Sequence, residues 1–231
     1  MDKLIQTLIS GLSLGSIYAL IALGYTMVYG IAKMLNFAHG DIIMVGAYAV
    51  ITAVFTMGLP PFIAILISIA LCALLGIVIE FLAYRPLRQA QPLAVLITAI
   101  GVSYLLQNLA LLIYGSEQKA FPTIVALPTV HIGGVYIDGI TLATLVVTAV
   151  IMVALSLFIN KTRMGKAMRA VSEDKEAAEL MGISVNRTIT VTFAIGSALA
   201  GVAAIFYGAA YTYIRPTTGA MPGIKAFTAA V

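Results

Sequence analysis

The chain has 231 residues, of which 61% are hydrophobic and 10% are charged, and its mean hydropathy is +1.07. Soluble globular domains carry about 25% charged residues, so this composition excludes a soluble protein and predicts a membrane protein. The formal net charge of +4 would suggest nucleic acid in a soluble chain. Here the basic residues cluster in loops between apolar runs, as membrane orientation requires, which argues against nucleic-acid binding.

Six apolar runs are long enough, or nearly long enough, to cross a bilayer as helices, which takes about 20 residues. They cover residues 4–31, 42–57, 62–82, 93–114, 140–159 and 189–214. None shows the strict alternation of a membrane strand. We therefore predict an all-α fold, a polytopic membrane helical bundle surrounded by lipid. The first run is too long for the core of a signal peptide and is interpreted as a retained span.

We expect residues 1–231 to form a single transmembrane domain. Because the chain stops at Val231 inside a new apolar segment, we also expect this domain to be incomplete at its C-terminal end.

Three loops carry most of the basic residues and predict the orientation. Lys33 lies in one loop, Arg85 and Arg88 lie in a second, and residues 161–187 contribute six more Lys and Arg. Cytoplasmic loops are enriched in Lys and Arg. We therefore expect these three loops inside the cell, with the N-terminus and the loop 116–139 outside.

Small residues recur at the spacing that lets membrane helices approach closely. The pairs are Gly11 with Gly15, Gly196 with Ala200, and Ser197 with Gly201. They predict a tightly packed bundle or oligomer.

A polar segment, residues 34–41, lies between the first two apolar runs. Asn36 is predicted to cap the following helix, while His39, Gly40 and Asp41 bring polar groups close to membrane depth, where such groups tend to be functional. This pattern is typical of a discontinuous transporter helix, whose N-terminal dipole would receive a substrate carboxylate. The alternative is an ordinary cytoplasmic turn in which Asp41 is solvated.

Gln107 and Asn108 are further candidates for the substrate pathway, because both are polar and lie inside a span. Adjacent helical positions point about 100° apart. At most one of them therefore faces a pathway squarely, while the other can bond a neighbouring helix. The alternative for either residue is a structural hydrogen bond between helices, and we favour it. No second ligand lies near His39, so no metal site is predicted.

The segment 161–187 is rich in charge, and residues 172–182 within it are predicted to form one short helix. Ser172 is expected to be its N-cap, with Glu173 and Asp174 in the first turn and Gly182 at its end. So short a helix needs a surface to pack against.

One apolar stripe on this helix consists of Ala177, Leu180 and Met181, while Lys175 and Glu176 leave the stripe and are expected to be solvated. We expect the stripe to dock on a cytoplasmic partner; the alternative is a helix lying against lipid headgroups or against its own bundle. The candidate contact residues are Ser172, Glu173, Asp174, Glu176, Ala177, Leu180, Met181 and Gly182.

No nucleotide-binding motif is present. The pair Gly165 and Lys166 is followed by Ala167, and Asn160 stands where a P-loop needs its first glycine. The chain is therefore predicted to be neither an ATPase nor any other enzyme, and no catalytic residue is assigned.

Four stretches together resemble the permease subunits of bacterial branched-chain amino acid ABC transporters. Residues 24–30 read GYTMVYG, residues 35–41 read LNFAHGD, residues 165–182 read GKAMRAVSEDKEAAELMG, and residues 223–231 read GIKAFTAAV.

The resemblance implies a bacterial inner-membrane protein that works with several partners. It implies a second permease chain, usually related but distinct, two cytoplasmic ATPase subunits that bind ATP and Mg, and an extracytoplasmic substrate-binding protein. This chain itself would bind no cofactor, and residues 161–187 would be its coupling segment.

Urea and short-chain amide permeases share much of this pattern and remain an alternative for the substrate. A secondary transporter or a channel is the alternative from another class. A secondary transporter is expected to carry a buried ionisable relay, and a channel a repeated filter, and neither pattern is visible.

Overall fold

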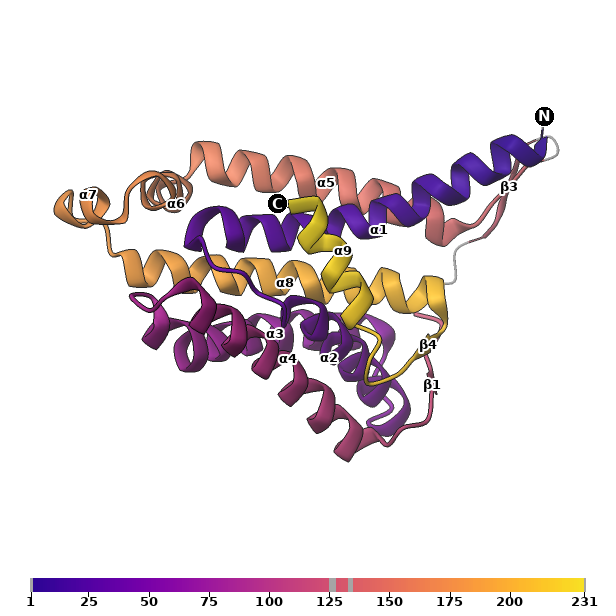
Figure 1. Cartoon of the computed structure of the whole chain (residues 1–231). Coiled ribbons are helices and arrows are strands. Elements are labelled where there is room, and N and C mark those ends of the chain that lie inside the picture. The colour runs from indigo at the N-terminus through magenta and orange to yellow at the C-terminus, as the bar shows by residue number, and fades with distance from the viewer. Residues whose placement is uncertain (1, 125–127, 133–134, 231) are drawn as a thin grey trace.

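The computed structural model describes residues 2–124, 128–132 and 135–230, which form the helical bundle in Figure 1. Within these residues, six helices are long and apolar enough to cross a membrane. They correspond to the six predicted runs and confirm the predicted fold class. Val231, the last residue of the fourth stretch quoted above, lies outside the described residues.

The spanning helices are α1 (Asp2–Ala32), α2 (His39–Ile51), α3 (Pro61–Ile79), α4 (Pro92–Tyr114), α5 (Gly139–Lys161) and α8 (Val185–Tyr211). A π-helical turn (Thr52–Thr56) continues α2. A second π-helical turn (Glu80–Tyr84) and a 3-10 turn (Arg85–Leu87) continue α3. Shorter helices are α6 (Arg163–Glu173), α7 (Lys175–Leu180) and α9 (Ala220–Ala230).

The core of the bundle lies around α2 and α8. In each of them 67% of the apolar window is buried, whereas the value is 11% in α5. The outer helices therefore turn most of their apolar surface outward, as expected for contact with lipid or with another membrane subunit.

Small side chains let α8 approach its neighbours closely. A Cβ atom on Gly76 of α3 would lie 2.0 Å from Ser197 Oγ of α8, and one on Gly24 of α1 would lie 2.8 Å from the Gly196 carbonyl. Two of the predicted small-residue pairs thus contribute to helix packing inside the chain.

The first half of α1 extends beyond the core. No atom lies within 4 Å of a Cβ built on Gly11 or Gly15, so this pair makes no close contact inside the described chain. The strands β2 (Val130–Ile132) and β3 (Val135–Ile137) form a hairpin beside it. The side chain of Gln6 holds this hairpin by two hydrogen bonds to the backbone of Tyr136.

Two further strands link distant loops at the same end of the bundle. β1 (Lys119–Ala120) pairs antiparallel with β4 (Tyr213–Ile214). The loop after α4 is thereby fixed to the segment between α8 and α9.

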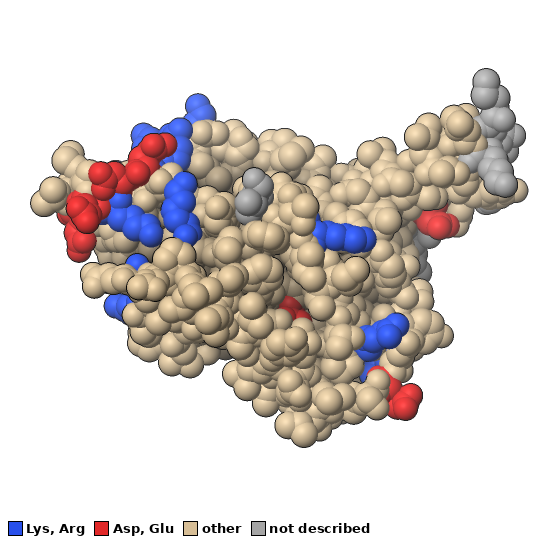
Figure 2. All heavy atoms as spheres, in the orientation of Figure 1, with Lys and Arg blue, Asp and Glu red and all other residues tan. Residues whose placement is uncertain are grey.

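The three basic loops lie together, as predicted. Lys33, Arg88 and Lys175 line one hollow of about 240 Å³, and Figure 2 shows Lys and Arg gathered around α6, α7 and the nearby helix ends. We call this the basic end of the bundle. The N-terminus and the β2–β3 hairpin lie at the opposite end (Figure 1).

The prediction of one helix over residues 172–182 is wrong. Ser172 lies in the last turn of α6, where its hydroxyl donates to the Arg169 carbonyl at 2.7 Å. Asp174 has an extended backbone, and its Oδ1 accepts the N–H groups of Glu176 at 2.9 Å and Ala177 at 3.0 Å. Asp174, and not Ser172, is the N-cap, because its carboxylate satisfies two free N–H groups at once.

The end of this region agrees with the sequence. The chain leaves α7 through Gly182, whose φ of +82° is in the left-handed region. The Ile183 N–H returns to the Ala178 carbonyl at 3.0 Å and closes the turn.

Candidate transport and coupling sites

The first candidate site is the break between α1 and α2. Residues 33–38 run as irregular backbone from the basic end toward the middle of the bundle, so that α2 begins part-way along it (Figure 1). Tyr84 Oη lies 3.2 Å from the Leu35 carbonyl, and the Asn36 N–H donates to Tyr25 Oη at 3.3 Å. These tyrosines satisfy backbone groups that would otherwise be unpaired inside the membrane.

Asn36 does not cap α2. The N-cap is Ala38, and no side chain bonds to it. Asn36 is buried, and its Oδ1 accepts a hydrogen bond from Tyr84 Oη at 3.1 Å. The side chain is therefore used to hold the irregular segment against the turn that follows α3.

Asp41 is buried in the first turn of α2 and not solvated, which contradicts the alternative of an ordinary turn at this residue. Its carboxylate accepts hydrogen bonds from Ser103 Oγ and, at 3.0 Å, from Gln107 Nε2 of α4. The helix N-terminus adds favourable positive potential. Together these groups stabilise a buried acid that has no salt bridge within the described residues.

The neighbouring Asn108 does not join this cluster. It is exposed, and its side chain donates to the Tyr104 carbonyl of its own helix at 2.8 Å. Gln107 therefore bonds the neighbouring helix α2, whereas Asn108 points outward and bonds its own helix instead of a neighbouring one.

The start of α2 also meets the start of α9. A Cβ on Gly40 would lie 2.0 Å from the Gly219 carbonyl oxygen and 2.8 Å from Gly223 Cα. Only glycine permits this contact, which brings two helix N-termini together. His39 is fully buried beside it and meets the Tyr25 ring edge-on at 5.8 Å, so it packs α2 against α1.

The second candidate site is at the basic end. Glu80 is fully buried and forms a salt bridge with Arg88, which also donates to Asn186 at the start of α8. Thr190 Oγ1 donates to the other Glu80 oxygen at 2.7 Å. This network fixes the turns after α3 against α8, next to the segment that carries α7.

α7 presents its predicted apolar stripe to the outside. Leu180 is 89% exposed and Met181 is 82% exposed, and Ala177 is exposed as well. Ala178, which is 3% exposed, makes the contact with the bundle instead. A short helix thus offers two large apolar side chains that nothing in the described chain covers.

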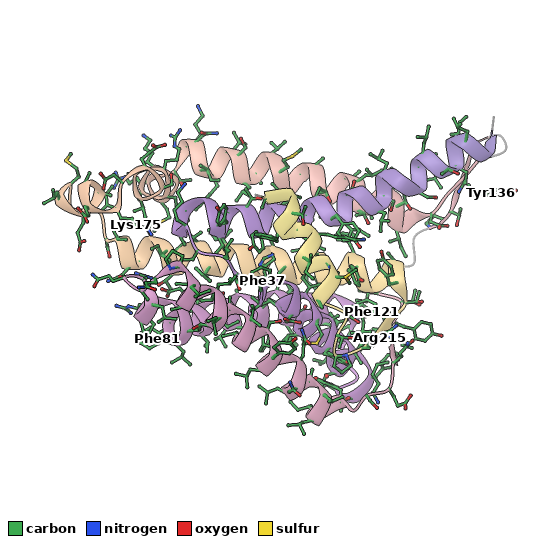
Figure 3. All side chains as sticks on the ribbon, viewed as in Figure 1. Phe37, Phe81, Phe121, Tyr136, Lys175 and Arg215 are labelled. Atoms are coloured by element: carbon green, nitrogen blue, oxygen red, sulfur yellow. The ribbon has the colours of Figure 1, made fainter. Side chains whose placement is uncertain are left out.

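Lys175 is half-buried and not freely solvated, contrary to expectation. Its Nζ donates at 2.9 Å to the carbonyl of Ala32, the last residue of α1. Burial, followed by the charges of Arg88 and Lys33, lowers the pKa of Lys175 from its usual value. Lys175 therefore fixes the start of α7 to the end of α1. In Figure 3 it is labelled just below α6.

Two basic residues, Lys225 and Arg215, were not among the site residues predicted from the sequence. Lys225 lies on α9, where its Nζ donates to Tyr18 Oη at 3.2 Å, and Arg215 lies on the turn before α9. The available signal was a lone lysine inside an apolar segment, which is expensive unless it serves a purpose.

A polytopic bundle in which two helix N-termini meet beside buried polar side chains is typical of membrane transport proteins. The family model described as "Branched-chain amino acid transport system / permease component" matches residues 7–231. The chain belongs to this family. It is a transport subunit and not a catalytic one, and the resemblance drawn from its sequence is confirmed.

Several curated relatives are similar over nearly the whole chain. The high-affinity branched-chain amino acid transport system permease protein BraD of Pseudomonas aeruginosa is 46% identical over 98% of this chain and 78% of its own length. The corresponding protein LivH of Escherichia coli K12 is 42% identical over the same shares. A probable LivH of Methanocaldococcus jannaschii is 28% identical over 94% of this chain and 70% of its own length. No solved structure matches the chain significantly.

These matches decide between the classes considered above. A permease component of a transport system is neither a secondary transporter working alone nor a channel. Membership of such a system also implies partner subunits.

Proposed function

We propose that the chain is the permease subunit of an ATP-driven importer for branched-chain amino acids in the bacterial inner membrane, with its basic end in the cytoplasm. The family and the names of the relatives support the substrate. The gathering of Lys and Arg at one end supports the orientation.

The assembly that we propose contains a second, related permease chain, two ATPase subunits and an extracytoplasmic binding protein. The ATPase subunits carry ATP and Mg, because this chain has no P-loop. The apolar outer faces of the bundle offer surface for the second permease as well as for lipid.

The coupling role of residues 161–187 rests on one observation above all, the exposure of Leu180 and Met181 on α7. Large apolar side chains exposed together mark a contact with another protein or with the membrane. The exposed acids Glu176 and Glu179 on the same helix favour a protein over lipid headgroups. We assign Ala177, Leu180 and Met181 to the contact with an ATPase subunit. Asp174 and Gly182 begin and end the helix that carries them, and Lys175 attaches it to the bundle.

The test is the variant Leu180→Asp in the complete complex. The side chain makes little contact within the chain, so the permease should fold and insert normally. A charge without a partner in an apolar interface costs several kcal/mol. The ATPase subunits should therefore co-purify poorly, and leucine uptake and substrate-stimulated ATP hydrolysis should both be lost.

Leu180→Met is the matched control, because it keeps an apolar side chain of similar volume. It should retain association and uptake. Normal association of the Leu180→Asp variant would show that α7 does not bind the ATPase. Uptake of labelled urea in place of leucine, isoleucine and valine by the unmodified complex would refute the proposed substrate.

We also include the start of α2 in the proposed transport pathway, with Asp41 and Gln107 as its central pair. The buried carboxylate and its two donors support this assignment, since ionisable groups inside a membrane usually have a function. Three neighbouring residues then act by holding this region in place. Asn36 holds it against the turn after α3, His39 packs it against α1, and Gly40 packs it against the start of α9.

A further inference from the structure

Lys225 is a charged residue beside the middle of the first spanning helix. Its partner Tyr18 lies midway along the span Leu4–Ala32, and Lys225 Nζ is 3.2 Å from Tyr18 Oη and 4.6 Å from the centre of the tyrosine ring. Lys225 is nevertheless exposed on the surface of this chain. A lysine within a membrane span is expected to face water, a ligand or other polar groups, because contact with lipid tails is costly.

Tyrosine side chains connect Lys225 to the end of the bundle opposite the basic end. Tyr18 Oη lies 3.4 Å from Tyr211 Oη, and the Tyr211 ring stacks on Tyr207 with centres 4.3 Å apart. Tyr207 and Tyr211 line a hollow of about 460 Å³, together with Arg215. A row of aromatic hydroxyls and rings thus runs from this hollow to Lys225.

Helix geometry makes the hollow and Lys225 parts of one surface. Met221, which also lines the hollow, stands four residues before Lys225, so both lie on the same face of α9. Figure 2 shows basic side chains over α9 and near β4, well apart from those of the basic end.

Arg215 is held at the entrance of this surface. Its backbone N–H donates to Thr218 Oγ1 at 2.8 Å, and the Thr218 N–H returns to the Arg215 carbonyl at 2.9 Å, which fixes the turn before α9. Figure 3 shows Arg215 beside this turn. Within the part of the chain that the structure describes, neither Arg215 nor Lys225 forms a salt bridge. The surface therefore carries two positive charges that make no ion-pair contact with a carboxylate of the described residues.

We propose that this surface guides the substrate through the membrane, and that Arg215 and then Lys225 bind its carboxylate while the tyrosine rings contact its apolar side chain. This inference rests on the proposed function and specifies how an amino acid is recognised. Arginine and lysine form charge-assisted hydrogen bonds with carboxylates, and aromatic rings bury aliphatic side chains. A neutral molecule such as urea has no carboxylate with which the two positive charges could form charge-assisted hydrogen bonds.

The experiment uses the complete complex in vesicles, with labelled leucine supplied on the binding protein. Loss of one charge-assisted hydrogen bond should reduce transport about tenfold or more. We therefore expect slow leucine uptake in Lys225→Met and in Arg215→Gln. ATP hydrolysis stimulated by the loaded binding protein should persist, so that more ATP is used for each leucine transported.

Two control variants separate a lost contact from a damaged fold. Lys225→Arg keeps the positive charge and should retain most of the uptake. Ile224→Met alters the adjacent exposed position of α9 and should match the unmodified complex. Repeating the Arg215→Gln measurement in vesicles of phosphatidylcholine alone distinguishes a substrate carboxylate from an anionic lipid headgroup.

The outcomes are distinguishable. Uptake by Lys225→Met and Arg215→Gln at the unmodified rate would overturn the inference, as would a loss that Lys225→Arg does not rescue. A defect of Arg215→Gln that disappears without anionic lipid would assign this arginine to headgroups and overturn its part. If the unmodified complex itself takes up no leucine, the proposed function fails.

Discussion

The salt bridge between Glu80 and Arg88 provides the sharpest test of the packing at the basic end. The Glu80 side chain is 0% exposed and that of Arg88 is 14% exposed. Replacing Arg88 by Met leaves a buried carboxylate without its cation, which typically costs about 3–5 kcal/mol. Because Thr190 still donates to Glu80, we expect the lower end of this range, about 3 kcal/mol.

The assay is thermal unfolding of the purified permease in detergent, compared between two neighbouring arginines. Arg85 is exposed and lies over the Phe81 ring at 5.3 Å, so Arg85→Met should cost only about 0.5–1 kcal/mol. The double variant Glu80→Gln with Arg88→Met should recover much of the lost stability, because it removes the buried charge as well. Equal unfolding temperatures for Arg88→Met and Arg85→Met would refute this reasoning.

Two further predictions concern the contacts of α2 and α7. Gly40→Ala should destabilise the permease by about 1–3 kcal/mol and slow uptake, because the new methyl group would lie 2.0 Å from the Gly219 carbonyl oxygen. Gly30→Ala is the control, since no atom lies within 4 Å of a Cβ built there. It should leave both the unfolding temperature and the uptake unchanged. Lys175→Met should leave expression intact but reduce uptake, because α7 loses its hydrogen bond to α1; undiminished uptake in vesicles would show that this bond is dispensable.

The helices of this fold could be predicted from the sequence because membrane insertion imposes a length and a polarity on each span. The predicted second run began at residue 42, whereas α2 begins at His39. The predicted cap at Asn36 would start the helix two residues too early, and the apolar run starts three residues too late, since neither signal carries information on hydrogen bonds made by distant helices. Asp41 is tolerated there because Ser103 and Gln107, more than 60 positions away, donate to it.

Local sequence preferences also competed in ways that only the structure resolves. Ser172 and Asp174 are both good N-cap residues. Asp174 caps α7 because α6 continues through Ser172 and ends at Glu173. The buried side chains of Met168 and Val171 hold α6 in the bundle over this length. Ala177, Leu180 and Met181 still form one apolar stripe after this change, since their spacing along the chain is the same.

The contacts described here form a continuous connection between the two candidate sites. At the basic end, Lys175 holds α7 to the last carbonyl of α1. Directly after that carbonyl, residues 33–38 lead into α2, and Tyr84 holds this segment at Asn36. Tyr84 itself belongs to the π-helical turn that Glu80 begins, and Glu80 is fixed to α8 through Thr190. If α7 binds an ATPase as proposed, its displacement would act on the end of α1 and on the start of α2 through direct contacts, without passing through the apolar packing between the spans.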